Sequence, residues 1–344
     1  MNKIPLLIDT DPGGDDAMAI MMAQGSGLFD IVAICPVNGN SPLRETKRNA
    51  MDLACYYGID TRVAIGADAP LFKGMITNSN FKRMAKYLKK EGPEADFQYG
   101  GQMFHFDFPA PSKEFDPKPA WDVIYEEAVK AGGELVILAI GPLTDLALAF
   151  AKYRDLHKLV KQIVVMGGSA YGGNHTPVAE FNVLIDPYAF QSVLTQDIPF
   201  RMVGLEACAC GYHTLDEVRE LAETDTVIAP MLKAYYGTIL ERAKNPDHPA
   251  VKNGRMVFFD AVAMATLIDP SVCDYLYTHV EVETRSPIAF GQTVVDKRYG
   301  SAAVRLKGAS DANCEVALNC DRDKYVKMMK DCLIRGFGKE VRRS

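Results

Sequence analysis

Two kinds of hydrophobic pattern, one typical of strands and one typical of helices, alternate along the first two thirds of the chain. Short, unbroken apolar runs predict strands, and the longer segments between them predict helices. The runs that predict strands are 5–11, 30–37, 135–141 and 163–169, and the segments that predict helices include 15–24 and 43–58. Unbroken apolar strands are typical of a parallel sheet covered on both faces. We therefore expect an α/β fold, a doubly wound, mostly parallel sheet flanked by helices, with the active site at the C-terminal ends of the strands.

The remaining segments extend this pattern. Helices are expected at 214–244, 257–268 and 321–335, and strand-like pieces at 276–283 and 301–307. Residues 72–118 interrupt the alternation, and a long irregular segment in a compact α/β domain is more typical of a functional lid than of a linker. Because α/β folds often exceed about 250 residues as one unit, we expect residues 1–344 to form a single domain with a lid-like insertion at about 72–118.

Composition narrows the classes of protein to which the chain can belong. Hydrophobic residues at 48% and charged residues at 24% are typical of a globular protein with a sizeable core. The net charge of −6 offers no basic surface for a phosphate backbone, so nucleic acid is not an expected partner. No run approaches the roughly 18 apolar residues of a membrane span, and the start lacks the apolar core of a signal peptide. These features predict a cytoplasmic protein with no membrane partner.

Eight cysteines are scattered along the chain, several of them inside apolar runs. Such cysteines are typical of small buried hydrophobes in a reducing compartment. Cys208 and Cys210 form a C-x-C pair, but no second pair or histidine stands at metal spacing from them. Zinc is therefore not expected.

The sharpest feature is an acidic cluster in IDTDPGGDDAMA, where Asp9, Asp11, Asp15 and Asp16 fall within eight residues at a strand-to-helix junction. One carboxylate at a helix start is commonplace, because it caps free amides and meets the positive end of the helix dipole. Four carboxylates packed together repel and raise one another's pKa unless a cation holds them. Ligation by oxygen alone selects a hard ion, calcium or magnesium.

This cluster resembles the N-terminal signature D-x-D-P-G-x-D-D of the nucleoside hydrolases, in which a small apolar helix follows. Five further segments resemble the family in the same order and at compatible spacing: PVNGN (36–40), IGPLTDLAL (140–148), VVMGGS (164–169), AEFNVLIDP (179–187) and FFDAVAMATLIDP (258–270). The resemblance implies an enzyme that hydrolyses the N-glycosidic bond of ribonucleosides to ribose and free base. Its partner is then a small-molecule nucleoside, and a homo-oligomer, dimer or tetramer, is implied as well.

By the same resemblance, a calcium ion (Ca2+) is held by the side chains of Asp11, Asp16 and Asp260 and by the backbone carbonyl of Ile140. A water and two ribose hydroxyls complete its shell. Asp11 serves in addition as the catalytic base, since a carboxylate is still needed beside calcium to activate water. Asp260 also stands out on physical grounds, because a buried charge in so apolar a helix needs a counter-ion. The alternative for Asp260 is a helix N-cap.

The resemblance assigns the ribose to an asparagine after the second strand and to an E-x-N segment. The residues implied in substrate binding on this side are Asp15, Asn40, Met166, Asn174, Glu180 and Asn182. Among them, Asn174 is placed near the 5′ end and Met166 under the sugar. A lone loop asparagine is otherwise a turn residue, and a methionine after a strand is otherwise core.

The side that faces the base departs from the best-known branch of the family. That branch has a histidine before the last aspartate ligand, whereas this chain has Phe259. The chain resembles more closely a purine-preferring branch, with Phe259 and Phe81 where that branch has tryptophan. We expect both rings to stack on the base, with purine ribosides slightly favoured, unless Phe259 is ordinary core. His105 and His175 are alternative proton donors, although a loop histidine is more often a solvated surface residue.

Two other functions fit parts of the sequence. The missing histidine favours a calcium-dependent nucleoside-binding pseudo-enzyme. The initial D-x-D is also typical of haloacid-dehalogenase-like phosphatases, but these need Thr or Val after the second aspartate, where this chain has Pro12. Turnover of a riboside separates the three, because they yield free ribose, nothing or free phosphate.

Overall fold

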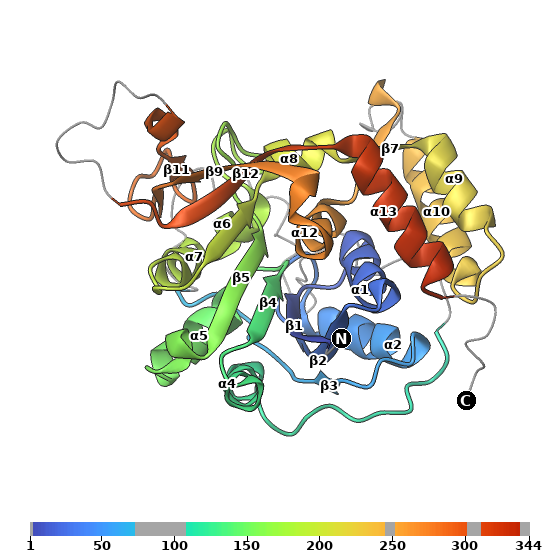
Figure 1. The fold of residues 1–344 in the computed structure, drawn as a ribbon, viewed down its shortest axis with the longest axis horizontal. Helices are drawn as coiled ribbons and strands as arrows, with labels where there is room; N and C mark the ends of the chain where they lie inside the picture. The colour runs from blue at the N-terminus through green and yellow to red at the C-terminus, as the bar shows by residue number, and fades with distance from the viewer. Residues whose placement is uncertain (1–2, 73–107, 245–251, 301–310, 338–344) are drawn as a thin grey trace, which may run out of the picture.

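A computed structural model describes residues 3–72, 108–244, 252–300 and 311–337 of the chain. Its centre is an eight-stranded sheet in the order β3-β2-β1-β4-β5-β6-β12-β9 (Figure 1). The strands are, in that order, Arg62–Val63, Phe29–Pro36, Ile4–Thr10, Leu135–Ala139, Val160–Met166, Phe200–Val203, Cys314–Cys320 and Cys273–Thr278. Neighbouring strands are parallel except β12 and β9, which are antiparallel. The doubly wound, mostly parallel sheet predicted from the sequence is confirmed.

Helices cover both faces of the sheet (Figure 1). One face carries α1 (Gly14–Ser26), α2 (Leu43–Tyr56), α8 (Leu205–Cys210), α9 (Leu215–Glu223), α10 (Ala229–Ala243), α12 (Phe259–Ile268) and α13 (Arg322–Arg335). The other carries α4 (Ala120–Ala131), α5 (Thr144–Lys152) and α7 (Pro187–Leu194). Within β1, Leu6 and Ile8 belong to the first core and Leu7 to the second, and all three are fully buried. An unbroken apolar strand is needed because each of its faces meets a helix layer.

Several boundaries differ from the sequence expectation. The segment 214–244 forms α9 and α10, and 276–283 forms the end of β9 with β10 (Val280–Val282). The expected strand at 301–307 lies outside the described residues. Three strands of the central sheet, β3, β6 and β12, were not predicted, because their runs are short or broken by polar residues. All three join the sheet through pairing with other strands, which local periodicity does not report.

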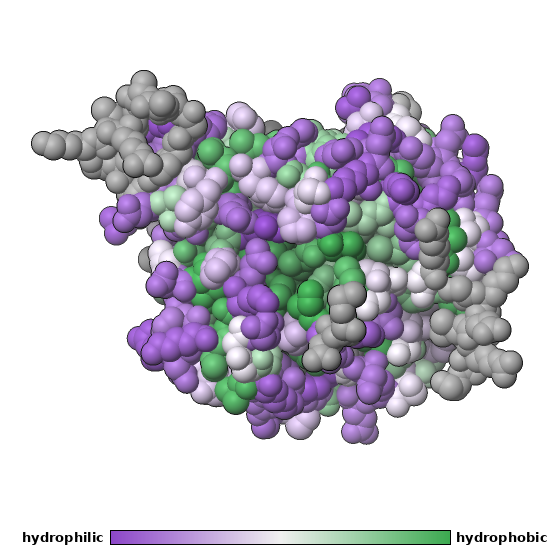
Figure 2. Space-filling view, in the orientation of Figure 1, coloured by the Kyte–Doolittle hydropathy of each residue, from purple (hydrophilic) through white to green (hydrophobic). Residues whose placement is uncertain are grey.

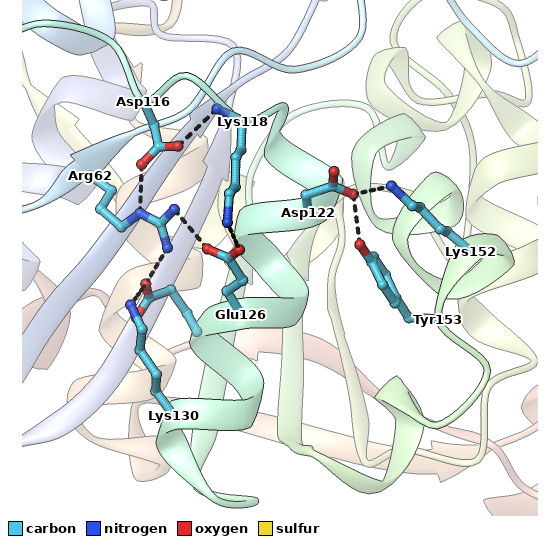
Figure 3. A network of polar contacts seen from close by, with 9 residues as sticks. Arg62, Asp116, Lys118, Asp122, Glu126, Lys130, Lys152 and Tyr153 are labelled. Carbon is cyan, nitrogen blue, oxygen red and sulfur yellow. Dashed lines mark hydrogen bonds and ion pairs between the residues drawn. The ribbon is translucent and has the colours of Figure 1, made fainter.

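The described end of the 72–118 segment is tied to the body by ion pairs (Figure 3). Arg62, on β3, donates to Asp116 at 2.7 Å, and its other guanidinium nitrogens reach Glu126 at 2.9 Å and Glu127 at 2.6 Å on α4. The hydrogen bond from Arg62 lowers the pKa of Asp116. On the other side of α4, Asp122 accepts from residues at the end of and just after α5 (Figure 3). These contacts fix where the chain re-enters the fold, at residues 116–131.

Hydrophobic residues gather over the centre of the face drawn in Figure 2, and hydrophilic residues surround them. This distribution agrees with the apolar strands that run through the middle of the molecule in the same view (Figure 1). None of the helices in the described ranges is long and apolar enough to cross a membrane.

Candidate active site

The site lies where the sheet changes its winding direction. From β1 the chain continues to β2 and β3 on one side, and β4, β5 and β6 follow on the other side of β1. Such a switch point opens a crevice at the carboxyl ends of the two central strands. Asp11 follows β1 and Ile140 follows β4, and the Ile140 amide donates to the Asp9 carbonyl at 2.8 Å. The two strand ends are therefore held side by side, with an acidic residue and a carbonyl at their tips.

Asp16 is fixed at the start of α1 by two hydrogen bonds. The Thr10 hydroxyl donates to one carboxylate oxygen at 2.5 Å, and the Gly13 amide donates to the other at 2.8 Å. The side chain is fully buried in the first turn of the helix, where the dipole favours negative charge. Thr10 was not singled out from the sequence, since a threonine at a strand end carries no signal of its own.

Three carboxylates converge between α1 and α12. One oxygen each from Asp15, Asp16 and Asp260 lies within 4.8 Å of the other two. Asp260 is 3% exposed and stands inside the first turn of α12, whose N-cap position is Phe258. The alternative of Asp260 as an N-cap therefore fails. Burial, followed by the charges of Asp15, Asp16 and Asp11, raises its pKa well above the ordinary value.

Asp11 lies beside this trio and has one uncommitted oxygen. Its Oδ2 accepts a hydrogen bond from the Asn40 amide, while its buried Oδ1 has no partner among the described residues. Burial and the charge of Asp16 raise the pKa of Asp11 well above its ordinary value. A buried carboxylate oxygen without a donor is costly, so the arrangement calls for a cation or a proton at this point.

Two glycines allow the close approach around Asp11. A side-chain carbon at Gly39 would lie 2.1 Å from Asp11 Oδ2, and one at Gly141 would lie 3.1 Å from Asp11 Oδ1. Both belong to motifs quoted above, PVNGN and IGPLTDLAL. The sequence did not predict this role for them, although a glycine two or three residues after a buried strand is the available signal for it.

This donor set fits a hard divalent cation. Every group that converges here offers oxygen, and the four carboxylates of Asp11, Asp15, Asp16 and Asp260 interact electrostatically with one another. Oxygen-only ligation selects ions such as calcium or magnesium over the softer metals. The carboxylate trio measured by distance contains Asp15, whereas the sequence expectation placed Asp11 with Asp16 and Asp260.

Apart from this cluster, Asp9 of β1 and Asp145 of α5 form a buried acidic pair. Asp9 is buried with neither carboxylate oxygen hydrogen-bonded to a described residue, and burial and the charge of Asp145 raise its pKa. Burial raises the pKa of Asp145 to about 7, against the hydrogen bond that it accepts from the Ala67 amide at 2.7 Å. Burial and the repulsion between the two carboxylates therefore favour the protonated, uncharged form of these acids. The sequence did not predict this pair, because Asp145 lies far along the chain from Asp9.

The E-x-N segment joins the ends of β4 and β5. Glu180 caps α6 (Phe181–Ile185), accepting from the Asn182 amide at 2.9 Å and the Val183 amide at 3.2 Å, and it also accepts from Gly168 at 3.0 Å. The side-chain nitrogen of Asn182, Nδ2, donates to the backbone carbonyls of Ile140 and Met166, each at 3.1 Å. Its buried Oδ1 has no partner in the described part of the chain. Asn182 therefore presents a free acceptor beside the Ile140 carbonyl.

The other predicted substrate contacts are less uniform. Asn40 is half-buried next to Asp11, and Met166 is buried against Asn182. Asn174 is exposed, and its Oδ1 lies 3.1 Å from a ring nitrogen of His175. Phe259 is half-buried at the start of α12 and packs against the larger core. Phe81 lies outside the described residues, as does His105.

The described histidines near these elements are poor proton donors at neutral pH. His213 is buried between Phe258 and Tyr325, with ring centroids at 5.1 and 5.3 Å. Burial lowers its pKa to about 4. Burial also lowers the pKa of His175, which packs on Phe181. Both rings therefore stay neutral at pH 7.

One aromatic residue near the acidic cluster was missed. The ring of Tyr235, on α10, closely approaches Gly14, because a side-chain carbon at Gly14 would come within 2.1 Å of a ring carbon and 2.8 Å of the hydroxyl. Tyr235 also packs against Phe258, with ring centroids 5.8 Å apart. Its contact with the start of α1 depends on tertiary packing, for which the sequence carries no signal.

Comparison with known proteins agrees with this geometry. The family model described as inosine-uridine preferring nucleoside hydrolase matches residues 6–327. The non-specific ribonucleoside hydrolase RihC of Klebsiella pneumoniae is 30% identical over 323 residues, covering 94% of this chain and 96% of that protein. RihC of Salmonella agona is also 30% identical, with coverage of 94% and 95%.

Solved structures show the same fold. An inosine-guanosine nucleoside hydrolase superposes with a TM-score of 0.77 at 27% identity, covering 96% of this chain and 98% of that one. A plant nucleoside hydrolase superposes with a TM-score of 0.77 at 25% identity, with coverage of 96% and 99%. The resemblance drawn from the six motifs is confirmed. The chain therefore belongs to the inosine-uridine preferring nucleoside hydrolase family, enzymes that hydrolyse the N-glycosidic bond of ribonucleosides.

Proposed function

We propose that this enzyme is a calcium-dependent ribonucleoside hydrolase in which Asp11 is the catalytic base and purine ribosides are slightly favoured. The observation that carries the proposal is the unpartnered, buried Oδ1 of Asp11 at the switch point, next to the carboxylates of Asp15, Asp16 and Asp260. A general base needs a free lone pair and a pKa raised toward the working pH. Asp11 supplies both, since burial and the charge of Asp16 raise its pKa.

The side chains of Asp11, Asp16 and Asp260 and the carbonyl of Ile140 would hold the cation. When bound, a divalent cation supplies positive charge that favours ionisation of a nearby water and orients vicinal hydroxyls. Calcium is proposed over magnesium because it accepts six to eight oxygen ligands in flexible geometry, which suits a site built from carboxylates, a carbonyl and sugar hydroxyls. The four protein groups come from β1, α1, α12 and the end of β4, so the fold assembles them only when complete.

Asp11 takes the proton of the attacking water as oxygen adds to the anomeric carbon and the bond to the base breaks. Attack and departure pass through a sugar with oxocarbenium character, so a base on one face and a stabilised leaving group on the other are both needed. The hydrogen bond from the Asn40 amide fixes one oxygen of Asp11, which leaves Oδ1 for the water. Because this hydrogen bond holds the Asp11 carboxylate in place, part of the substrate's binding energy goes into orienting the water and the anomeric carbon.

Asn182 and Asp15 are proposed to form hydrogen bonds with the ribose hydroxyls. The unpartnered Oδ1 of Asn182 accepts from a hydroxyl, and the half-buried Asp15 faces the same cluster. Glu180 contributes mainly by position, because three backbone amides already use most of its lone pairs. Asn40, Met166 and Asn174 complete the proposed sugar contacts.

Inosine is expected to yield free ribose and hypoxanthine, with a kcat/KM roughly 5–150-fold above that of 2′-deoxyinosine. The reason is that a missing 2′-hydroxyl leaves a buried acceptor of Asn182 or Asp15 without its partner. Reducing-sugar release and base absorbance measure both substrates. A pseudo-enzyme releases nothing, and a phosphatase releases phosphate from phosphomonoesters only.

Asn174→Ala is the matched control for this comparison. Asn174 is exposed and is placed near the 5′ end, so its loss should leave the ratio between inosine and 2′-deoxyinosine unchanged. Equal efficiency of the wild-type enzyme on the two sugars would contradict the assignment of Asp15 and Asn182 to the diol.

The leaving base is proposed to stack on Phe259, with Phe81 as a second ring. Phe259 stands one residue before Asp260 and is half-buried, so part of its ring is free for contact. Aromatic stacking adds about 0.5–1.5 kcal/mol beyond burial, and a two-ring purine covers more of the surface than a pyrimidine. The relative named for inosine and guanosine supports purine preference, whereas the relatives named as non-specific favour only a modest one. No histidine acts as proton donor in this proposal.

Phe259→Ala is expected to lower kcat/KM for inosine about 2–10-fold more than for uridine, because stacking is lost mainly by the larger base. Phe259→Trp, which enlarges the ring, should shift the ratio the other way. Steady-state kinetics on both nucleosides gives the ratio, and circular dichroism checks the fold. Equal losses on inosine and uridine would assign Phe259 to the core, and loss of the pH profile in His175→Ala would restore a histidine acid.

The proposal also takes the chain as one cytoplasmic catalytic unit that assembles into a dimer or tetramer. Family resemblance is the support for this part. Neither the pseudo-enzyme nor the phosphatase alternative is favoured by the comparisons, since the relatives are named as ribonucleoside hydrolases.

A further inference from the structure

Two cysteines face each other across the antiparallel edge of the central sheet. Cys273 is the first residue of β9 and Cys320 the last of β12, and the two are direct register partners. Opposite residues of an antiparallel pair project from the same face with their Cβ atoms about 4.5–5.5 Å apart. The Cα separation of such a pair falls within the range of about 4.4–6.8 Å that a disulfide spans. A bond between them therefore needs no change in the path of either strand.

The surroundings favour reaction at Cys273. A hydrogen bond from the Cys320 thiol and the nearby charge of Arg201 lower the pKa of Cys273. The same contact raises the pKa of Cys320. By contrast, burial raises the pKa of Cys35 and Cys208, neither of which gains a comparable thiol hydrogen bond from a described residue. The thiolate is the reactive form of cysteine, so Cys273 is the nucleophile of the pair.

We propose that Cys273 and Cys320 are a reversible dithiol–disulfide site whose oxidant is hydrogen peroxide. The Cys273 sulfur attacks one peroxide oxygen, the O–O bond breaks, and a sulfenic acid and one water form. The Cys320 sulfur then attacks the Cys273 sulfur, the S–O bond breaks, and a second water leaves. Two thiols are thereby oxidised by two electrons, and one peroxide is reduced to two waters. Both side chains are buried, at 8% and 5% exposure, which suits an oxidant the size of water.

The position of the two cysteines implies that the disulfide changes the stability of the enzyme. Cys273 follows η2 (Pro270–Val272), which leads from the end of α12, and Cys320 precedes Asp321, which caps α13. The Asp321 amide donates to the Val272 carbonyl at 2.8 Å, so the two connections already touch. A disulfide at this point closes a loop of about 50 residues and restricts the unfolded chain. The oxidised enzyme should be the more stable form.

The test uses the full chain, first fully reduced and then treated with hydrogen peroxide. Free thiols are blocked with N-ethylmaleimide, and tryptic peptides are analysed by mass spectrometry. Cys273 is the one cysteine of peptide 256–285, whereas Cys314 and Cys320 share peptide 308–322, so fragment spectra must separate these two. We expect a linked pair through Cys273 and Cys320, lost on addition of dithiothreitol, and a rise in Tm of roughly 5 °C.

Cys320→Ser should abolish both the linked peptide and the rise in Tm. Cys332→Ser is the matched control, because Cys332 is a buried cysteine on α13, away from the paired ends of β9 and β12, and it should keep both. If Cys320→Ser does not fold, the wild-type peptide map alone decides the question. Links through Cys208, Cys210 or Cys314, irreversible sulfinic acid at Cys273, or thiols that stay reduced would each overturn the proposal.

Discussion

Asp11→Asn is expected to lower kcat for inosine by at least about 10²-fold, because the variant loses the base that takes the proton from water. Asparagine has the same size and still accepts the Asn40 amide through its carbonyl oxygen, so the fold should persist. The fall should appear in kcat as well as in kcat/KM, since the proton transfer belongs to the transition state. Steady-state release of ribose measures both constants.

Asp145→Asn is the matched control. Asp145 is a fully buried aspartate near the same strand ends, but it interacts with Asp9 and Ala67 and is outside the carboxylate trio. Its substitution should leave kcat within a few fold of the wild-type value. Normal turnover by Asp11→Asn, or an equal loss in Asp145→Asn, would contradict the assignment of Asp11 as base.

The part of the site that the sequence predicted best is the part encoded locally. Asp15 and Asp16 are adjacent at a helix start, and Asp11 directly follows the strand before that helix, so one motif shows all three. Asp260 was found through an apolar helix with a single charge, and the structure brings it to the same cluster. A buried charge needs a counter-ion or a hydrogen-bond partner, so a charged residue within an apolar segment can be recognised as a candidate site residue from the sequence alone.

Contacts that depend on long-range pairing were not visible. The Asp9–Asp145 pair joins residues separated by most of the first half of the chain. The E-x-N segment was assigned to ribose as a whole, yet the structure uses Glu180 largely as a helix cap. In the fold, β3, β6 and β12 were missed for the same reason, because strands that are short or broken by polar residues are stabilised by their neighbours and not by their own period.

Calcium is expected to raise the Tm, and more at pH 8 than at pH 5. Burial raises the pKa of Asp11, Asp16 and Asp260 above their unfolded value of 3.8, so the folded state without cation binds protons that the unfolded state releases. The stability contributed by these groups is therefore fully present below that value and is lost as pH rises through the folded pKa values. A cation that replaces the protons restores it above that range.

At 100 times its Kd, calcium should add about 2.7 kcal/mol to the free energy of unfolding, which corresponds to roughly 5 °C in Tm.

Asp260→Asn removes one charge from the trio and should raise the Kd by about 10-fold or more, with a matching rise in the calcium needed for activity. Asp52→Asn is the control, since Asp52 is a buried carboxylate on α2 paired with Arg48 and should leave the calcium response unchanged. Differential scanning fluorimetry after treatment with a chelator gives both curves, with magnesium as the competing ion. Two results would mean that protons alone neutralise the carboxylates. One is a Tm that does not change with calcium at pH 8, and the other is a calcium-induced rise in Tm that is as large in Asp260→Asn as in the wild-type enzyme. The ligand set of the site would then have to be assigned anew.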